Sequence, residues 1–123
     1  GTIGGMLEII IPLSDETTAL TTGTAKWSSR LLPAMSLLFI KGAVNVAPTG
    51  ASIIVDMNVS GSSILSTKLS IDAGEYSSAT AATPAVFSST ALLDDLDVSF
   101  DIDQKGSTVA GAGLKIKITG LLS

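Results

Sequence analysis

The chain has no histidine and no cysteine, and aromatic residues make up only 4% of its 123 residues. It therefore lacks the usual ligands of zinc, haem and iron–sulfur clusters, and it cannot build Ser-His-Asp or Cys-His catalytic groups. We expect no catalytic residues, no metal site and no cofactor, and hence not an enzyme. Packing or assembly, rather than disulfide bonds, must stabilise the fold, and the core must be aliphatic.

Charge is also scarce. Charged residues are 15% of the chain and the net charge is -4. The seven Lys and Arg residues are scattered, whereas tracking a phosphate backbone needs clustered cations, so no direct nucleic-acid binding is expected. The longest apolar run, Leu31 to Ile40, is interrupted by Pro33 and Ser36. It falls short of the roughly 18 residues of a membrane span, so no membrane partner is expected.

What the chain does have is apolar–polar alternation with a period of two, the pattern of a half-buried strand. Leu96 to Asp103 alternates apolar residues with Asp and Ser, and Leu114 to Thr119 alternates them with Lys. We expect these two strands to pair across the Gly-rich connection 104–113, with the aspartates beside the lysines. A second hairpin is expected from residues 53–59 and 63–71, with a three-residue loop that sets Val59 opposite Ser63.

Weaker strand patterns occupy residues 7–11, 25–32, 35–46 and 85–88. Short strands separated by Gly, Pro, Ser and Asp clusters, about eight in all, predict an all-β protein: a single antiparallel β-sandwich with a jelly-roll-like arrangement. We expect one domain overall. Residues 1–12 form an N-terminal arm and first strand, and residues 13–123 form the β-sandwich.

Five aspartates between Asp94 and Asp103 raise the question of a calcium site. The spacing Asp101-x-Asp103-x-Lys105 resembles the start of an EF-hand loop, but Lys105 stands where an oxygen ligand belongs. A solvated strand face is the favoured interpretation, and a looser site at residues 94, 95 and 97 is the alternative.

Longer phrases of the chain carry a family resemblance. They are LSDETTALTTGTAK (13–26), APTG (47–50), SSILSTKLSIDAGE (62–75), TAATPAV (80–86) and DIDQKGSTVAGAGLK (101–115). Together they resemble a small β-domain of tailed-bacteriophage virion structural proteins, seen in capsid decoration or cement proteins and in the end domains of tail fibres. The resemblance covers about residues 13–119 and implies no catalytic residues. The segment 27–42 is more apolar than the pattern of that family.

The resemblance implies a virion protein. The first expectation is a capsid decoration, or cement, protein that binds the major capsid protein on the capsid exterior and stabilises the shell. The alternative is the terminal domain of a tail fibre or spike that binds a host receptor or glycan. Apolar segments that one small sandwich cannot cover predict a homo-oligomer, and the resemblance implies a trimer.

Candidate interface residues come from the apolar arm, the apolar run after residue 30, the long loop 74–85 and the apolar C-terminus. We expect either Leu37 or Leu38 to face a neighbouring subunit and the other to face the core. Trp27 is expected to anchor the core, and Arg30 to serve an interface or a salt bridge. The candidates are Ile3, Met6, Leu7, Arg30, Leu37, Leu38, Tyr76, Leu121 and Leu122.

Overall fold

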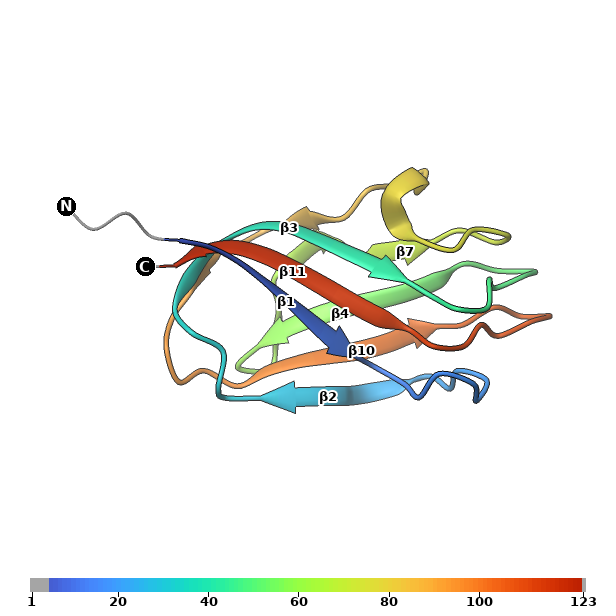
Figure 1. The fold of residues 1–123 in the computed structure, drawn as a ribbon, viewed down its shortest axis with the longest axis horizontal. Helices are drawn as coiled ribbons and strands as arrows, with labels where there is room; N and C mark the ends of the chain where they lie inside the picture. Colours follow the sequence, from blue (N-terminus) through green and yellow to red (C-terminus); the bar gives the residue numbers. More distant parts are fainter. Residues whose placement is uncertain (1–4, 123) are drawn as a thin grey trace.

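The computed structural model describes residues 5–122, and these residues form antiparallel β-sheets with a single short 3-10 helix, which confirms the all-β prediction. Six strands of seven to nine residues carry the architecture (Figure 1): β1 (Met6–Pro12), β2 (Gly23–Ser29), β3 (Met35–Ala43), β4 (Ile53–Val59), β10 (Val98–Gln104) and β11 (Lys115–Leu122). The remaining elements have two or three residues: β5 (Ser62–Ser63), β6 (Leu65–Thr67), β7 (Leu69–Ile71), η1 (Ser78–Thr80), β8 (Val86–Phe87) and β9 (Ala91–Leu92).

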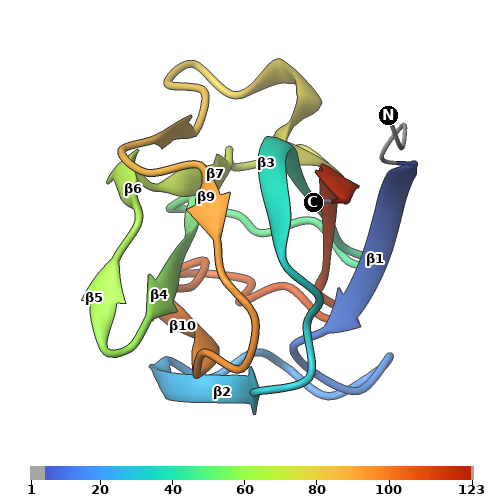
Figure 2. The same ribbon diagram turned by 90° about the vertical axis from the view of Figure 1, so that its left-hand side faces the viewer.

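Two sheets face each other in a sandwich-like arrangement (Figure 2). The first sheet has the strand order β1-β11-β3-β9, and the second sheet has the order β2-β10-β4-β5, with β7 also paired to β4. A small third sheet is formed by β6 and β8. No helix within residues 5–122 is both long and apolar enough to cross a membrane.

The core lies between the two sheets and consists mainly of aliphatic side chains, in agreement with the composition. Alternate residues of each long strand point inward, and the second sheet contributes Met57, Phe100 and Ile102 while the first contributes Ile116 and Ile118; each is at most 1% exposed. Burying one such side chain stabilises the fold by about 1.5–3 kcal/mol. The expected core anchor Trp27 is only partly buried, but it packs against the core with its ring 5.8 Å from that of Phe100.

The predicted pairing of the last two long strands is wrong. β10 lies between β2 and β4 in the second sheet, and β11 lies between β1 and β3 in the first. The connection between them therefore crosses from one sheet to the other. Alternation identifies the buried face of a strand, but both strands need neighbours on both sides, and distant segments supply them. Accordingly, Asp103 pairs with Lys68, and Lys117 pairs with Glu8.

The hairpin after β4 is tighter than predicted. Val59 lies opposite Ser62, and the turn consists of Ser60 and Gly61, both with positive φ. Two successive residues with positive φ form the tight turn whose twist suits a two-residue hairpin. The chain then leaves the second sheet, and pairing with β4 resumes at Leu69, opposite Val55. Alternation predicts that Ser63, Leu69 and Ile71 share one inward face; Leu69 and Ile71 are fully buried, whereas Ser63 is exposed.

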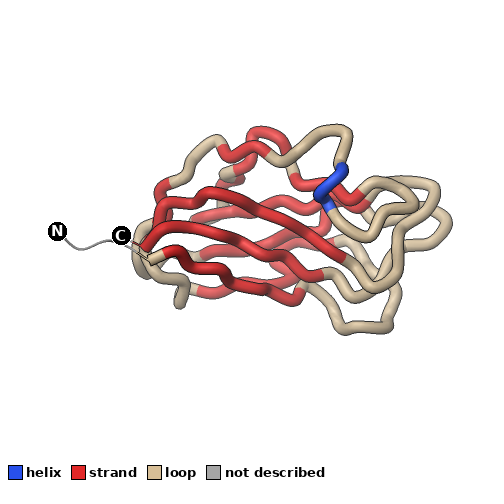
Figure 3. The backbone as a smooth tube through the Cα atoms, turned by 45° about the horizontal axis from the view of Figure 1, so that its top comes forward, coloured by secondary structure: helices blue, strands red, loops and turns tan. Residues whose placement is uncertain are grey.

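The start of β1 and the end of β11 lie at one end of the molecule, and the long loops after β1, β3, β7 and β10 lie at the other (Figures 1 and 3). At one end, the backbone N–H of Leu122 donates to the carbonyl oxygen of Gly5 at 2.9 Å. At the other end, isolated β-bridges tie three loops together through Ala19, Val46 and Ala112. The loops at that end are therefore held in place by backbone hydrogen bonds rather than by long strands.

Candidate interaction surface

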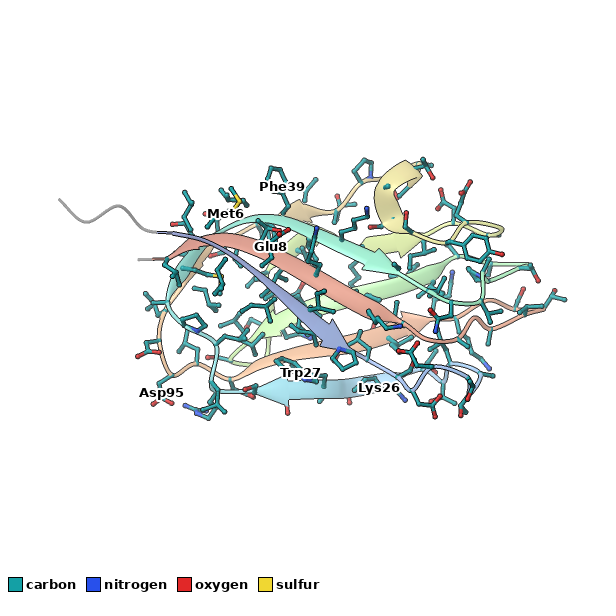
Figure 4. The ribbon with its side chains drawn as sticks, in the orientation of Figure 1. Met6, Glu8, Lys26, Trp27, Phe39 and Asp95 are labelled. Carbon is teal, nitrogen blue, oxygen red and sulfur yellow. The ribbon has the colours of Figure 1, made fainter. Side chains whose placement is uncertain are left out.

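The outward side of the first sheet carries exposed apolar side chains. Met6 and Ile10 of β1 and Phe39 of β3 are 65%, 68% and 66% exposed, and Leu121 of β11 lies opposite Met6 in the strand register. We call these four residues the apolar outer face. Figure 4 shows Met6 and Phe39 close together above the first sheet, with Glu8 beside them. Exposed apolar patches, especially those with polar residues around them, mark sites of interaction with other molecules.

Charged side chains separate the apolar ones on this face. The Nζ atom of Lys117 lies 3.0 Å from the Oε2 atom of Glu8. A hydrogen bond from Lys117, together with its positive charge, holds the pKa of the Glu8 carboxyl below its usual range. Lys115 similarly lies 2.6 Å from Glu16 and lowers the pKa of that carboxyl. These two pairs offset their own charges, and Lys41 of β3, opposite Lys117 in the register, adds an exposed cation to the same face.

Two open pockets lie on this side of the molecule. One, of about 440 Å³, is lined by Met6, Phe39 and Lys117 together with part of η1, including Ser78 and Ala79. The other, of about 250 Å³, lies farther along β1 and includes Ile10 in its lining. Their walls are side-chain methyl groups, an aromatic ring and lysine stems, which suit contact with a complementary protein surface better than bond-making chemistry.

The outward side of the second sheet is polar. Asp56 of β4 lies opposite Asp101 of β10 in the register. Lys68 separates the acids, with its Nζ atom 2.7 Å from Asp103 and 3.8 Å from Asp56. Asn58 donates a hydrogen bond to Asp101 at 2.9 Å. We call these five residues the Lys68 cluster. The hydrogen bond to Asp103 and the surrounding carboxylates raise the pKa of Lys68.

A metal-ion site needs several ligating side chains around one point. Within residues 5–122, no three His, Cys, Asp or Glu side chains are grouped so that they could hold a metal ion. In particular, the looser calcium site considered at Asp94, Asp95 and Asp97 has no such grouping. The acids of the Lys68 cluster are instead occupied by the ammonium group of Lys68 and by neighbouring hydroxyl and amide groups.

Four of the predicted interface residues lie on β1 and β3, and the structure separates them. Met6 belongs to the apolar outer face, but Leu7 points inward and packs against the core. Leu37 is 3% exposed, so it is the member of the Leu37/Leu38 pair that faces the core, and it does not belong to an interface. A shift in register opposite β11 turns both Leu38 and Phe39 outward, and Leu38 is 37% exposed.

The other predicted interface residues do not form one site. Arg30 is exposed and pairs with Asp95, its Nε atom 3.5 Å from the carboxylate. Tyr76 is exposed in the loop after β7, where its carbonyl oxygen accepts a hydrogen bond from the N–H of Val44. Leu121 and Leu122 are partly exposed at the end of β11. Ile3 lies outside the described residues.

The sequence patterns missed two members of the apolar outer face, Ile10 and Phe39. Ile10 stands in an unbroken apolar run, where alternation cannot assign a side, and aromatic residues in a small domain suggest the core. The information that would have assigned Ile10 to the outward side is the pairing of β1 with β11, which sets Ile10 opposite Lys117. A lysine that faces outward would have identified its apolar neighbour as outward-facing too.

No protein-family model, curated protein or solved structure matches this chain. The geometry of the two outer faces and the phrases of the sequence are therefore the grounds for a functional assignment.

Proposed function

We propose that this chain is a structural protein of a tailed-bacteriophage virion, where it decorates the capsid exterior and stabilises the shell by binding the major capsid protein. The observation that carries this proposal is the apolar outer face, which leaves Met6, Ile10 and Phe39 in water on a chain with few aromatic residues. Its virion context comes from the resemblance over about residues 13–119. The function is mechanical: apolar side chains buried at a subunit contact hold neighbouring proteins together.

A jelly-roll connectivity is part of the proposal, and nested strand pairing supports it. β1 pairs with β11, β2 with β10, β3 with β9, and β4 with β7. Such nesting results when one long hairpin rolls up into two facing sheets. Counting only these strands gives the eight of a jelly roll, an architecture found in viral capsid and lectin domains. Architecture alone does not assign a function, so the exposed surface remains the stronger support.

Association of the chain with itself also belongs to this proposal. Closed symmetry is the common way for identical subunits to cover exposed apolar surface. The expectation of three subunits comes from the resemblance to virion proteins and from no particular residue.

The test is binding to capsids of the phage that encodes the chain, after release of the endogenous protein. We expect the purified chain to sediment with the capsids and to raise the temperature at which they rupture. Phe39→Asp should weaken binding, whereas Leu31→Asp, at a 90% exposed position outside the apolar outer face, should bind normally. Purified virions without the chain, as judged by mass spectrometry, would contradict any virion role.

A second candidate, the terminal domain of a tail fibre or spike, is favoured by one observation. The loops after β1, β3, β7 and β10 lie at the end of the molecule remote from the start of β1 and the end of β11 (Figures 1 and 3), and Tyr76 belongs to the loop after β7. A receptor-binding domain displays its loops away from the point where it joins the fibre. Gold-labelled antibodies on intact virions distinguish the candidates, because label on the capsid supports decoration and label at tail tips supports the fibre domain.

A further inference from the structure

The edges of the two sheets are protected unequally. An open strand edge can pair with another chain, and proteins commonly blunt it by shortness, bulges or lysine. β9 and β5 have only two residues each, and β7, which also borders β4, has three. β2 carries Lys26, and its pairing with β10 is interrupted by a shift in register near Ala25, which has a positive φ of 48°. These edges are poor templates for an added strand.

β1 is the exception, with seven residues in the sequence Met-Leu-Glu-Ile-Ile-Ile-Pro. Its only charged side chain, Glu8, is paired with Lys117. No bulge interrupts its register with β11, which runs without a break from Met6 to Pro12. β1 is therefore a long, regular and largely apolar edge strand.

The direction of each backbone group of β1 follows from two hydrogen bonds. Leu122 N–H donates to Gly5, and Leu13 N–H donates to Leu114, each at 2.9 Å. Hydrogen-bonded pairs alternate along an antiparallel ladder, so the odd-numbered residues of β1 bond to β11. The N–H and C=O groups of Met6, Glu8 and Ile10 point to the free edge. Within residues 5–122, no backbone hydrogen bond occupies that edge.

Pro12 agrees with this assignment. It has the same parity as Ile10, so its missing N–H faces the free edge and removes no bond to β11. Proline is accepted in a sheet at such solvent-facing edge positions. The free edge therefore offers alternating donors and acceptors from Met6 to Ile10 and a final acceptor at Pro12.

We infer that β1 pairs in antiparallel fashion with β1 of a second copy of this chain, with Ile9 on the two-fold axis. This register sets Glu8 opposite Ile10 of the second copy, and Met6 opposite Pro12. Every free-edge N–H and C=O group of β1 then has a hydrogen-bonding partner, with one exception. The carbonyl of Met6 has none, because Pro12 opposite it has no N–H. A register centred on Glu8 would instead set two like charges directly opposite each other, which destabilises a sheet.

The side chains and the symmetry of this contact are mutually consistent. Met6 and Ile10 have both free-edge backbone groups and exposed side chains. Pairing through the backbone therefore also covers part of the apolar outer face. Each Glu8 keeps its own Lys117 and brings no unpaired charge to the contact. A two-fold contact uses the same surface on both copies and closes at two subunits. The dimer replaces the trimer that the resemblance implies, and it holds whether or not the chain belongs to a virion.

The first test is the mass of the purified chain by light scattering, combined with amide hydrogen exchange by NMR. We expect a dimer in which the amides of Glu8 and Ile10 exchange more slowly as concentration rises. The amides of Leu7 and Ile9 should be slow throughout, because β11 already binds them. A trimer, a chain that stays monomeric up to its solubility limit, or Glu8 and Ile10 amides that remain fast would overturn the inference.

Matched variants separate edge pairing from contact through the face. Ile10→Pro removes one free-edge donor without touching the ladder to β11, and Ile10→Lys adds a charge at the same position. Each should raise the dimer Kd about ten- to a hundredfold, with circular dichroism confirming an intact fold. Phe39→Lys changes the same face but not the edge, since β11 lies between β3 and β1. It should leave the dimer intact. A dimer that survives both Ile10 variants, or that Phe39→Lys dissociates, would show that edge pairing is wrong.

Discussion

Replacing Lys68 with methionine removes the one cation of the Lys68 cluster. The side chain of Asp56 is only 8% exposed, while that of Lys68 is 46% exposed. Breaking a buried ion pair costs about 3–5 kcal/mol and breaking an exposed one about 0.2–1 kcal/mol. This cluster lies between those limits, so we expect a loss of about 1–3 kcal/mol in the free energy of unfolding. For a domain of this length, the thermal midpoint should fall by about 4–12 °C.

The assay is thermal and urea unfolding followed by circular dichroism, with Lys115→Met as the matched control. Lys115 and Glu16 form a pair in which both side chains are at least one-third exposed, so the control should lose less than about 1 kcal/mol. Adding Asp56→Asn to Lys68→Met should recover part of the loss, because the uncompensated buried charge is removed. An effect of Lys68→Met no larger than that of Lys115→Met would refute the reasoning.

The same cluster has a defined pH dependence. The pKa of Lys68 is raised in the folded state above the ordinary value of 10.5. A raised pKa gives stability that is fully present below the unfolded pKa and is lost as pH rises through the folded pKa. The difference in stability between the wild-type chain and Lys68→Met should therefore shrink above about pH 10.5. A difference that grows with alkalinity would have the wrong sign.

Three further predictions concern the core and the apolar outer face. In urea unfolding, Leu37→Ala should lower the free energy of unfolding by about 2–5 kcal/mol, and Leu38→Ala by less than about 1 kcal/mol. Equal losses would contradict the register shift that buries Leu37 and leaves Leu38 exposed. Phe100→Ala should lower the free energy of unfolding by about 3–5 kcal/mol and shift the fluorescence of Trp27 to longer wavelength. An unchanged emission wavelength would contradict the packing of the two rings. The lowered pKa of Glu8 gives stability that is present above about pH 4.5 and lost as pH falls through the folded pKa. Glu8→Gln should flatten this part of the acid unfolding curve, and an unchanged curve would contradict the ion pair.

The faces of the strands could be predicted from the sequence because they are a local property. In residues 55–59 and 98–103, polar side chains at every second position define the outward side. The structure places Val55, Met57, Phe100 and Ile102 inward, each at most 1% exposed. Burial of alternate residues needs no knowledge of which strand lies alongside, so the all-β class and most of the core follow from the pattern.

Strand partners could not be predicted, because several pairings satisfy the same alternation. Asp103 and Lys117 are compatible with direct pairing of their strands, yet each finds an opposite charge elsewhere. The apolar outer face depends on such long-range choices. In the run Ile9-Ile10-Ile11, the sequence does not say which residue faces solvent. Packing against the second sheet turns Ile11 inward and leaves Ile10 outside.

The pairing of β1 with β11 also has a consequence for how the chain acquires its structure. Met6 meets Leu121, so the first long strand finds its partner only when nearly the whole chain is present. Contacts between such distant residues slow folding, since a large loop must close first. During synthesis, the segment from Met6 to Pro12 therefore leaves the ribosome long before β11 exists. Until then its apolar residues are available to chaperones or to the same segment of another nascent chain, and productive folding must outpace that encounter.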